Sequence, residues 1–223
     1  MSLVKHTELM NLREVEISRI VRYLSDQTGG FADPKLVLIG GYALGRLLLF
    51  RGIHEIVTLF FKERKVGIWI DFKSCCTDTC EKRDVYGFMR CVKVLCDGAK
   101  ISIDFMEGQV RGRTDAQAFF VSDEFLSKAQ KVKIAIAKEV FEMYVPDYTD
   151  YFILKLMSAR PSDVRDITTL VWKKGIPENL RAQAKKMLAY PEVIDKNLPL
   201  IISDVADKRF LDSWKGTFVT RVY

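Results

Sequence analysis

The chain has 223 residues, 48% of them hydrophobic and 29% charged, with a net charge of +6 and a pI near 9.0. This composition excludes a disordered or low-complexity protein, and the length allows one large or two small domains. No apolar run approaches the roughly 20 residues of a membrane span, and the N-terminus lacks the apolar stretch of a signal peptide. The sequence therefore predicts a cytoplasmic protein without a membrane partner, and its positive charge weakly favours anionic partners.

The first half of the chain alternates helix and strand signals. Residues 8–27 carry apolar side chains at helical spacing, and "KLVLI" predicts a short buried strand that runs directly into a helix, "GGYALGRLLLF". The segments "HEIVTLFF" and "KVGIWIDF" are rich in β-branched and aromatic residues and predict strands. We expect a short helix or a long loop from "SCCTDTCEKRDVYGFM".

A hairpin is the clearest local signal. In "RCVKVLCDGAKISIDFMEG", two alternating runs are joined by Asp97-Gly98, the pair that a two-residue type I′ turn favours. This turn would place Val92 opposite Ile103 and Cys91 opposite Asp104. Asp104 would then point away from the core.

The second half predicts one more helix, two strands and a helical end. Ser122 is a good N-cap for "DEFLSK", and "VKIAIAKEVFEMYV" alternates as one strand or a pair. Two helices follow, "TDYFILKLMSAR" and "PSDVRDITTLVWKKG", with Pro161 in the first turn of the second and Gly175 at its end. We divide the chain into an α/β domain with an N-terminal helix, residues 1–145, and a C-terminal helical region, residues 146–223 that packs on it.

The five cysteines fall within one short stretch, at Cys75, Cys76, Cys80, Cys91 and Cys96. Their spacing does not match the paired C-x-x-C pattern of a zinc site. Reduced thiols, a disulfide and a metal site all stay open. A disulfide would suit a thermophile, and the scarcity of Asn and Gln points weakly in that direction.

Gly40 and Gly41 stand between a predicted strand and the N-terminus of a helix. Glycines there let backbone N–H groups approach an anion, and the helix dipole favours phosphate. A tight turn would need the same residues for steric reasons alone. The stretch is neither a P-loop nor a dinucleotide-binding G-x-G-x-x-G motif.

Three features together resemble one family. The glycine turn into a helix, the strand "ISIDFMEG" and the helical pair "YFILKLMSARPSDVRDITTLV" occur in the order of the nucleotidyltransferase fold, in the branch of AbiEii-type and related nucleotidyltransferase-like proteins. The resemblance covers about residues 36–190. It implies a mixed β-sheet flanked by helices, with a helical region at the C-terminal end.

The resemblance also implies transfer of a nucleoside monophosphate from a nucleoside triphosphate to a hydroxyl acceptor, with Mg²⁺ held by three carboxylates. Gly40 and Gly41 match the phosphate turn, and Asp104 matches the third carboxylate. The paired carboxylates should fall near "RGIHEIVTLFF", where Glu55 fits the first position but Val57 occupies the second. Asp71 is the remaining candidate ligand.

The helical pair carries the other matching residues. By the resemblance, Lys155 contributes to catalysis, and Arg160, Asp163 and Asp166 bind the nucleotide or orient the acceptor. A structural ion-pair network that joins the two helices is the alternative interpretation. Because the paired motif is incomplete, we expect either an active nucleotidyltransferase or an inactive homologue that binds a nucleotide, a nucleic acid or a protein. Basic residues compatible with the latter are Arg111, Arg113, Lys173, Lys174, Lys185 and Lys186.

Overall fold

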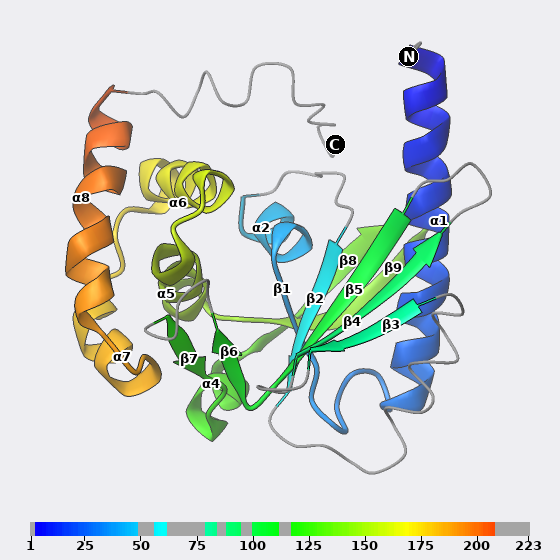
Figure 1. Ribbon diagram of the computed structural model, residues 1–223, viewed down its shortest axis with the longest axis horizontal. Helices are drawn as coiled ribbons and strands as arrows, with labels where there is room; N and C mark the ends of the chain where they lie inside the picture. Colours follow the sequence, from blue (N-terminus) through cyan, green and yellow to red (C-terminus); the bar gives the residue numbers. More distant parts are fainter. Residues whose placement is uncertain are drawn as a thin grey trace.

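A mixed seven-stranded sheet with helices on both sides forms the centre of the molecule (Figure 1). The structure is a computed structural model and describes residues 3–48, 56–61, 79–83, 88–94, 100–111 and 117–207. The strand order is β3-β4-β5-β2-β1-β9-β8, and a separate two-stranded sheet pairs β6 with β7. The predicted mixed α/β class, with a sheet flanked by helices, is confirmed.

The strands and helices have the following bounds, given in chain order. The strands are β1 (Val37–Ile39), β2 (Ile56–Phe61), β3 (Thr79–Arg83), β4 (Phe88–Val94), β5 (Lys100–Glu107), β6 (Gln109–Arg111), β7 (Ala118–Phe120), β8 (Gln130–Ile136) and β9 (Glu139–Val145). The helices are α1 (Leu3–Gln27), α2 (Gly41–Leu48), α4 (Asp123–Lys128), α5 (Tyr148–Ser158), α6 (Pro161–Lys174), α7 (Leu180–Met187) and α8 (Glu192–Asp207). None of the helices in these described ranges is both long and apolar enough to span a membrane.

Local sequence signals placed several element boundaries correctly. Ser122 caps α4, and its hydroxyl accepts a hydrogen bond from the Phe125 N–H at 3.1 Å. Pro161 begins α6, and Gly175 follows the last residue of that helix with a φ of +79°. The alternating run after α4 forms two antiparallel strands, β8 and β9. These signals act within a few residues, so they can be recognised in the sequence without knowledge of the tertiary structure.

Residues 79–83 form the edge strand β3, where we expected a helix or a loop. This strand pairs with β4 over its whole length, and Cys80 lies directly opposite Cys91. The sequence "TCEKR" has low strand propensity, and pairing with a neighbouring strand overrides that preference. The predicted strand in "KVGIWIDF" lies outside the described residues, as do Cys75, Cys76 and Cys96.

The predicted register of the β4–β5 hairpin is wrong by one residue. Val92 pairs with Ser102 rather than Ile103, and Arg90 rather than Cys91 lies opposite Asp104. The turn signal at Asp97-Gly98 is local, whereas β5 also pairs in parallel with β2 along its length. We attribute the register to the pairing and burial of the whole strand, which outweigh the preference of one turn.

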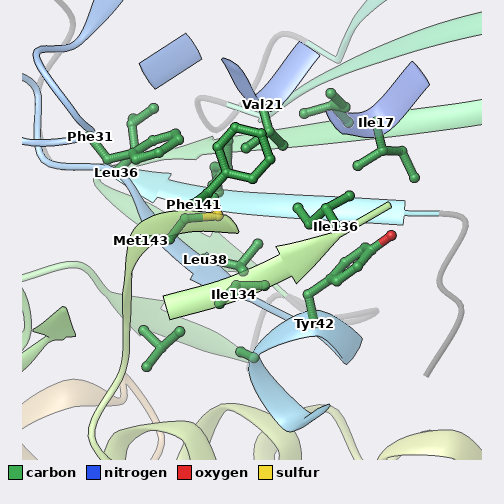
Figure 2. Close-up of a cluster of buried hydrophobic side chains, with 14 of the residues drawn as sticks. Ile17, Val21, Phe31, Leu36, Leu38, Tyr42, Ile134, Ile136, Phe141 and Met143 are labelled. Carbon is green, nitrogen blue, oxygen red and sulfur yellow. The ribbon is translucent and has the colours of Figure 1, made fainter. Parts of the chain in front are cut away.

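One hydrophobic core packs α1 against the sheet and extends to Tyr42 of α2 (Figure 2). Ile17 and Val21 of α1 are fully buried there, and Leu38 of β1 and Met143 of β9 belong to the same cluster. α1 runs along the side of the sheet away from α5, α6 and α8 (Figure 1). Burial of each such aliphatic side chain contributes roughly 1.5–3 kcal/mol, which holds α1 against the sheet.

A second core joins the C-terminal helices to the opposite face of the sheet. Val37 of β1 is buried in this cluster with Phe152 and Leu156 of α5 and Ile167 of α6. α8 is joined to α5 by a buried hydrogen bond, in which the Asn197 side-chain amide donates to the Leu156 carbonyl at 2.8 Å. The packing fixes α5 and α6 over the sheet face that carries Val37.

Asp150, in the first turn of α5, is a buried carboxylate that no sequence pattern singled out. Its side chain has no exposed surface. One oxygen accepts a hydrogen bond from the Gln183 amide at 2.9 Å, and the other has no hydrogen-bond partner among the described residues. Burial, helped by the nearby negative charge of Asp147, raises the pKa of Asp150 from its ordinary 3.8 to about 6, although Gln183 and Lys128 oppose the shift. Folding therefore favours the protonated form.

Asp150→Asn should change how stability depends on pH. The contribution of a protonated Asp150 is complete below pH 4 and is lost as pH rises through about 6. Relative to Asp150→Asn, the wild type should therefore lose roughly 2–3 kcal/mol of unfolding free energy between pH 4 and pH 8. Urea denaturation at both pH values measures this difference. Asp195→Asn, at a side chain 59% exposed, is the control, and an equal pH dependence in Asp150→Asn and wild type would contradict the assignment.

Candidate functional site

The glycine turn lies between β1 and the N-terminus of α2. Gly40 has a φ of +84°, a conformation that favours glycine, and Gly41 is the first residue of the helix. The Gly40 carbonyl accepts two hydrogen bonds, from the Leu44 N–H at 3.0 Å and from the Tyr151 hydroxyl at 3.0 Å. Tyr151 belongs to α5, so this second bond joins the turn to the helical pair.

Asp104 lies on the same row of the sheet as the end of β1. Ile39 pairs with Thr58, and Thr58 pairs with Asp104, so Asp104 is two strand spacings, about 10 Å, from the strand end that leads into Gly40. Successive residues of a strand point to opposite faces, so Asp104 points away from Ile103, but onto the face that carries the second core with Val37. That side is not open, because Asp104 is only 4% exposed.

Lys155 of α5 lies between two carboxylates of α6. Its amine donates to Asp163 Oδ1 at 2.8 Å and to Asp166 Oδ2 at 2.9 Å. All three side chains are buried, with exposed fractions of 11%, 0% and 6%. We call these three residues the lysine–aspartate cluster.

Further hydrogen bonds surround the lysine–aspartate cluster. Arg160 donates from Nε to Asp163 Oδ2 at 2.6 Å and from Nη2 to Oδ1 at 3.2 Å, and the Ser158 hydroxyl also donates to Asp163. On the other side, Arg165 Nη2 donates to Asp166 Oδ1 at 3.1 Å. Each carboxylate is thus shared between the buried lysine and an arginine closer to the surface.

The surroundings of Lys155 and Asp163 keep both of these side chains charged. Burial would lower the pKa of Lys155, but the electrostatic effects of Tyr151, Asp166 and Asp163 outweigh burial and raise it. Burial would raise the pKa of Asp163, but hydrogen bonds from Arg160 and Lys155 lower it to about 2. At neutral pH Lys155 is therefore a cation that two carboxylates neutralise. Such a lysine is unsuited to act as a general base.

Arg160 links the helical pair to the sheet. Its side chain is 53% exposed, and its pKa is raised chiefly by the hydrogen bond to Asp163 and further by the charges of Asp163, Asp166 and Asp104. The contribution of Asp104 places that carboxylate within electrostatic range of the guanidinium. The structure therefore gathers Asp104, Arg160 and the lysine–aspartate cluster on one side of the sheet.

The other two predicted Mg²⁺ ligands cannot be placed beside Asp104. Glu55 and Asp71 lie outside the described residues. Val57, the second position of the degenerate pair, is in register with Ile103, whereas Thr58 is in register with Asp104. Within the part of the chain that the structure describes, no group of three His, Cys, Asp or Glu side chains could hold a metal ion. Of the predicted Mg²⁺ ligands, Asp104 alone lies within the described residues, and one carboxylate does not make a metal site.

Two residues that contact the predicted site residues, Tyr151 and Ser158, were not predicted from the sequence. Tyr151 looked like one more apolar residue of its helix, and its partner Gly40 is 111 residues away. Ser158 is the last residue of α5 and lies five residues before Asp163, to which its hydroxyl donates. A serine at the end of a helix just before Pro161 was the sequence signal for this contact.

Comparison with known proteins gives a distant structural likeness. No family model and no curated protein matches the chain. A solved structure described as a "putative nucleotidyltransferase from H. pylori" is similar with a TM-score of 0.45 and 15% identity, covering 90% of this chain and 84% of that one. JHP933 from Helicobacter pylori is similar with a TM-score of 0.44 and 12% identity, covering 91% and 97%. Similarity of this degree establishes neither a shared family nor a shared activity.

Lys155→Met should destabilise the fold strongly, because it leaves two buried carboxylates without their cation. Removing one partner from a buried ion pair costs about 3–5 kcal/mol. Arg160→Met, at a half-exposed side chain that contacts the same Asp163, should cost about 1 kcal/mol or less. Urea denaturation at pH 7 measures both variants. Equal costs for the two substitutions would show that the cluster does not hold the helices together.

Proposed function

We propose that this chain is a nucleotidyltransferase-like protein that binds a nucleoside triphosphate, with the phosphates at the Gly40–Gly41 turn. The observation that carries the proposal is the hydrogen bond from Tyr151 to Gly40, because it joins the glycine turn to the helical pair of the sequence resemblance. Backbone N–H groups at a helix N-terminus can donate to phosphate oxygens, and Gly41 is the first residue of α2.

Arg160 is the cation best suited to meet the phosphates. Its side chain is half exposed, and it lies within electrostatic range of Asp104 on the same side of the sheet. Lys155 instead has its charge neutralised by Asp163 and Asp166 in a buried setting. We therefore assign nucleotide binding to Gly40, Gly41 and Arg160, and a supporting role to the lysine–aspartate cluster.

Transfer of a nucleoside monophosphate to a hydroxyl acceptor is the second candidate function. Asp104 favours it, since a buried carboxylate on the strand beside β2 matches the third carboxylate of the resemblance. Mg²⁺ would then need further oxygen ligands, and Glu55 and Asp71 are our candidates. The register counts against this function. The β2 residues that alternate in phase with Asp104 are Ile56, Thr58 and Phe60, and none of them carries a carboxylate.

A thermal-shift titration tests binding, with ATP, CTP, GTP and UTP, each with Mg²⁺ and with EDTA. A ligand at 100 times its Kd adds about 2.7 kcal/mol of stability, so one nucleotide should raise the Tm by several degrees. Gly41→Val should abolish this shift, because a branched side chain would obstruct the approach to the turn. Ala182→Val, at an exposed position of α7, is the control and should keep the shift. No shift with any triphosphate at millimolar concentration would contradict the proposal.

Incorporation of label from α-³²P-labelled nucleotide separates the two functions. If the chain is a transferase, label should appear in an acceptor in cell extract, and Asp104→Asn should remove it. Glu139→Gln, at a partly exposed carboxylate of β9 that pairs with Arg22, is the control. Binding without any transfer of label would support the nucleotide-binding function and contradict the transferase.

A further inference from the structure

We infer that Tyr151 is a positioning residue, whose hydroxyl orients the Gly40–Gly41 peptide so that its N–H group faces the phosphates. The inference rests on the proposed function, because it concerns the same nucleotide site. The hydroxyl donates to the Gly40 carbonyl at 3.0 Å from a side chain that is 1% exposed. Tyr151 would contact the protein backbone and not the ligand, so it is not a catalytic residue.

The geometry of the peptide explains how a bond to a carbonyl controls an N–H group. In a trans peptide the C=O of Gly40 and the N–H of Gly41 point in opposite directions. The Gly40 carbonyl points into α2, where it accepts from the Leu44 N–H. The Gly41 N–H therefore points out of the N-terminal end of α2, towards the place we propose for the phosphates.

Glycine makes this orientation costly to maintain. Gly40 has a φ of +84°, and a glycine pair can adopt many backbone conformations when nothing restrains it. A carbonyl oxygen accepts up to two hydrogen bonds, and here Leu44 and Tyr151 supply both. With both bonds in place the peptide cannot rotate without breaking two contacts. The turn is thus prepared for an anion before the anion arrives.

The lysine–aspartate cluster holds Tyr151 in place. The Lys155 amine lies 5.7 Å from the centre of the Tyr151 ring, one helical turn further along α5. Asp163 and Asp166 fix that amine from α6. A continuous set of contacts therefore runs from α6 through Lys155 and Tyr151 to the glycine turn. This arrangement gives Lys155, Asp163 and Asp166 a role at the site without direct contact to the nucleotide.

Tyr151→Phe tests the inference, because it removes the hydroxyl and keeps the ring. The matched control is Tyr148→Phe in the same helix, which loses a hydrogen bond from its hydroxyl to the Gly175 carbonyl at 2.5 Å. Hydrogen exchange of the ligand-free protein should become faster at the Leu44 amide, which donates to the Gly40 carbonyl, in Tyr151→Phe and stay as in wild type in Tyr148→Phe. Titration with the nucleotide that stabilises wild type should show about fivefold weaker binding for Tyr151→Phe only.

The outcomes separate the inference from the proposed function. If wild type binds a triphosphate and Tyr151→Phe binds equally well with unchanged exchange, Tyr151 is not a positioning residue. If no triphosphate binds wild type, the proposed function fails, and the exchange rates alone decide whether Tyr151 orders the turn. Equal effects of Tyr151→Phe and Tyr148→Phe on exchange at the Leu44 amide would show a general loss of stability and overturn the inference.

Discussion

The buried ion pairs of Lys155 are the constraint on which the arrangement of the helical pair depends. A lysine with an 11% exposed side chain would be costly to bury alone, and two carboxylates from α6 make its burial tolerable. The reverse also holds, since Asp163 and Asp166 need the cation. The angle between α5 and α6 is therefore fixed by charge as well as by the apolar contacts between the two helices. Replacing all three residues of the lysine–aspartate cluster together by apolar residues often preserves stability in other proteins, unlike removing the lysine alone. The buried charges are therefore better explained by a role in positioning than by stability.

This arrangement determines which groups are left for a ligand. Lys155 is bonded to Asp163 and Asp166 inside the helical pair, whereas Arg160 is half exposed and lies within electrostatic range of Asp104. The glycine turn is held from the same side, through Tyr151. The glycine turn, a half-exposed guanidinium and a buried carboxylate thus come from three separate segments. The helical pair bonds to the turn through Tyr151, and Asp104 lies within electrostatic range of Arg160. Arg160 is the N-cap of α6, directly before Pro161, and this position puts its guanidinium beside Asp163 at the edge of the cluster.

The sequence predicted what depends on neighbouring residues and missed what depends on distant ones. The cap at Ser122, the start of α6 at Pro161 and its end at Gly175 follow from local chemistry, and the structure shows them. The register beside Asp104 does not, because pairing with β2 competes with the turn at Asp97-Gly98. The bond from Tyr151 to Gly40 and the burial of Asp150 against Gln183 join segments that only the tertiary fold brings together. The roles of the candidate site residues stay predictions.

A crystal structure with a non-hydrolysable nucleoside triphosphate and Mg²⁺ tests the central claim most directly. The claim is that the lysine–aspartate cluster supports the site from behind while the glycine turn and Arg160 receive the phosphates. The account predicts phosphate oxygens within hydrogen-bond distance of the Gly41 N–H and the Arg160 guanidinium, with Lys155 still between Asp163 and Asp166. A Lys155 amine that has left both carboxylates to bind the phosphates, or a nucleotide bound away from the glycine turn, would contradict it.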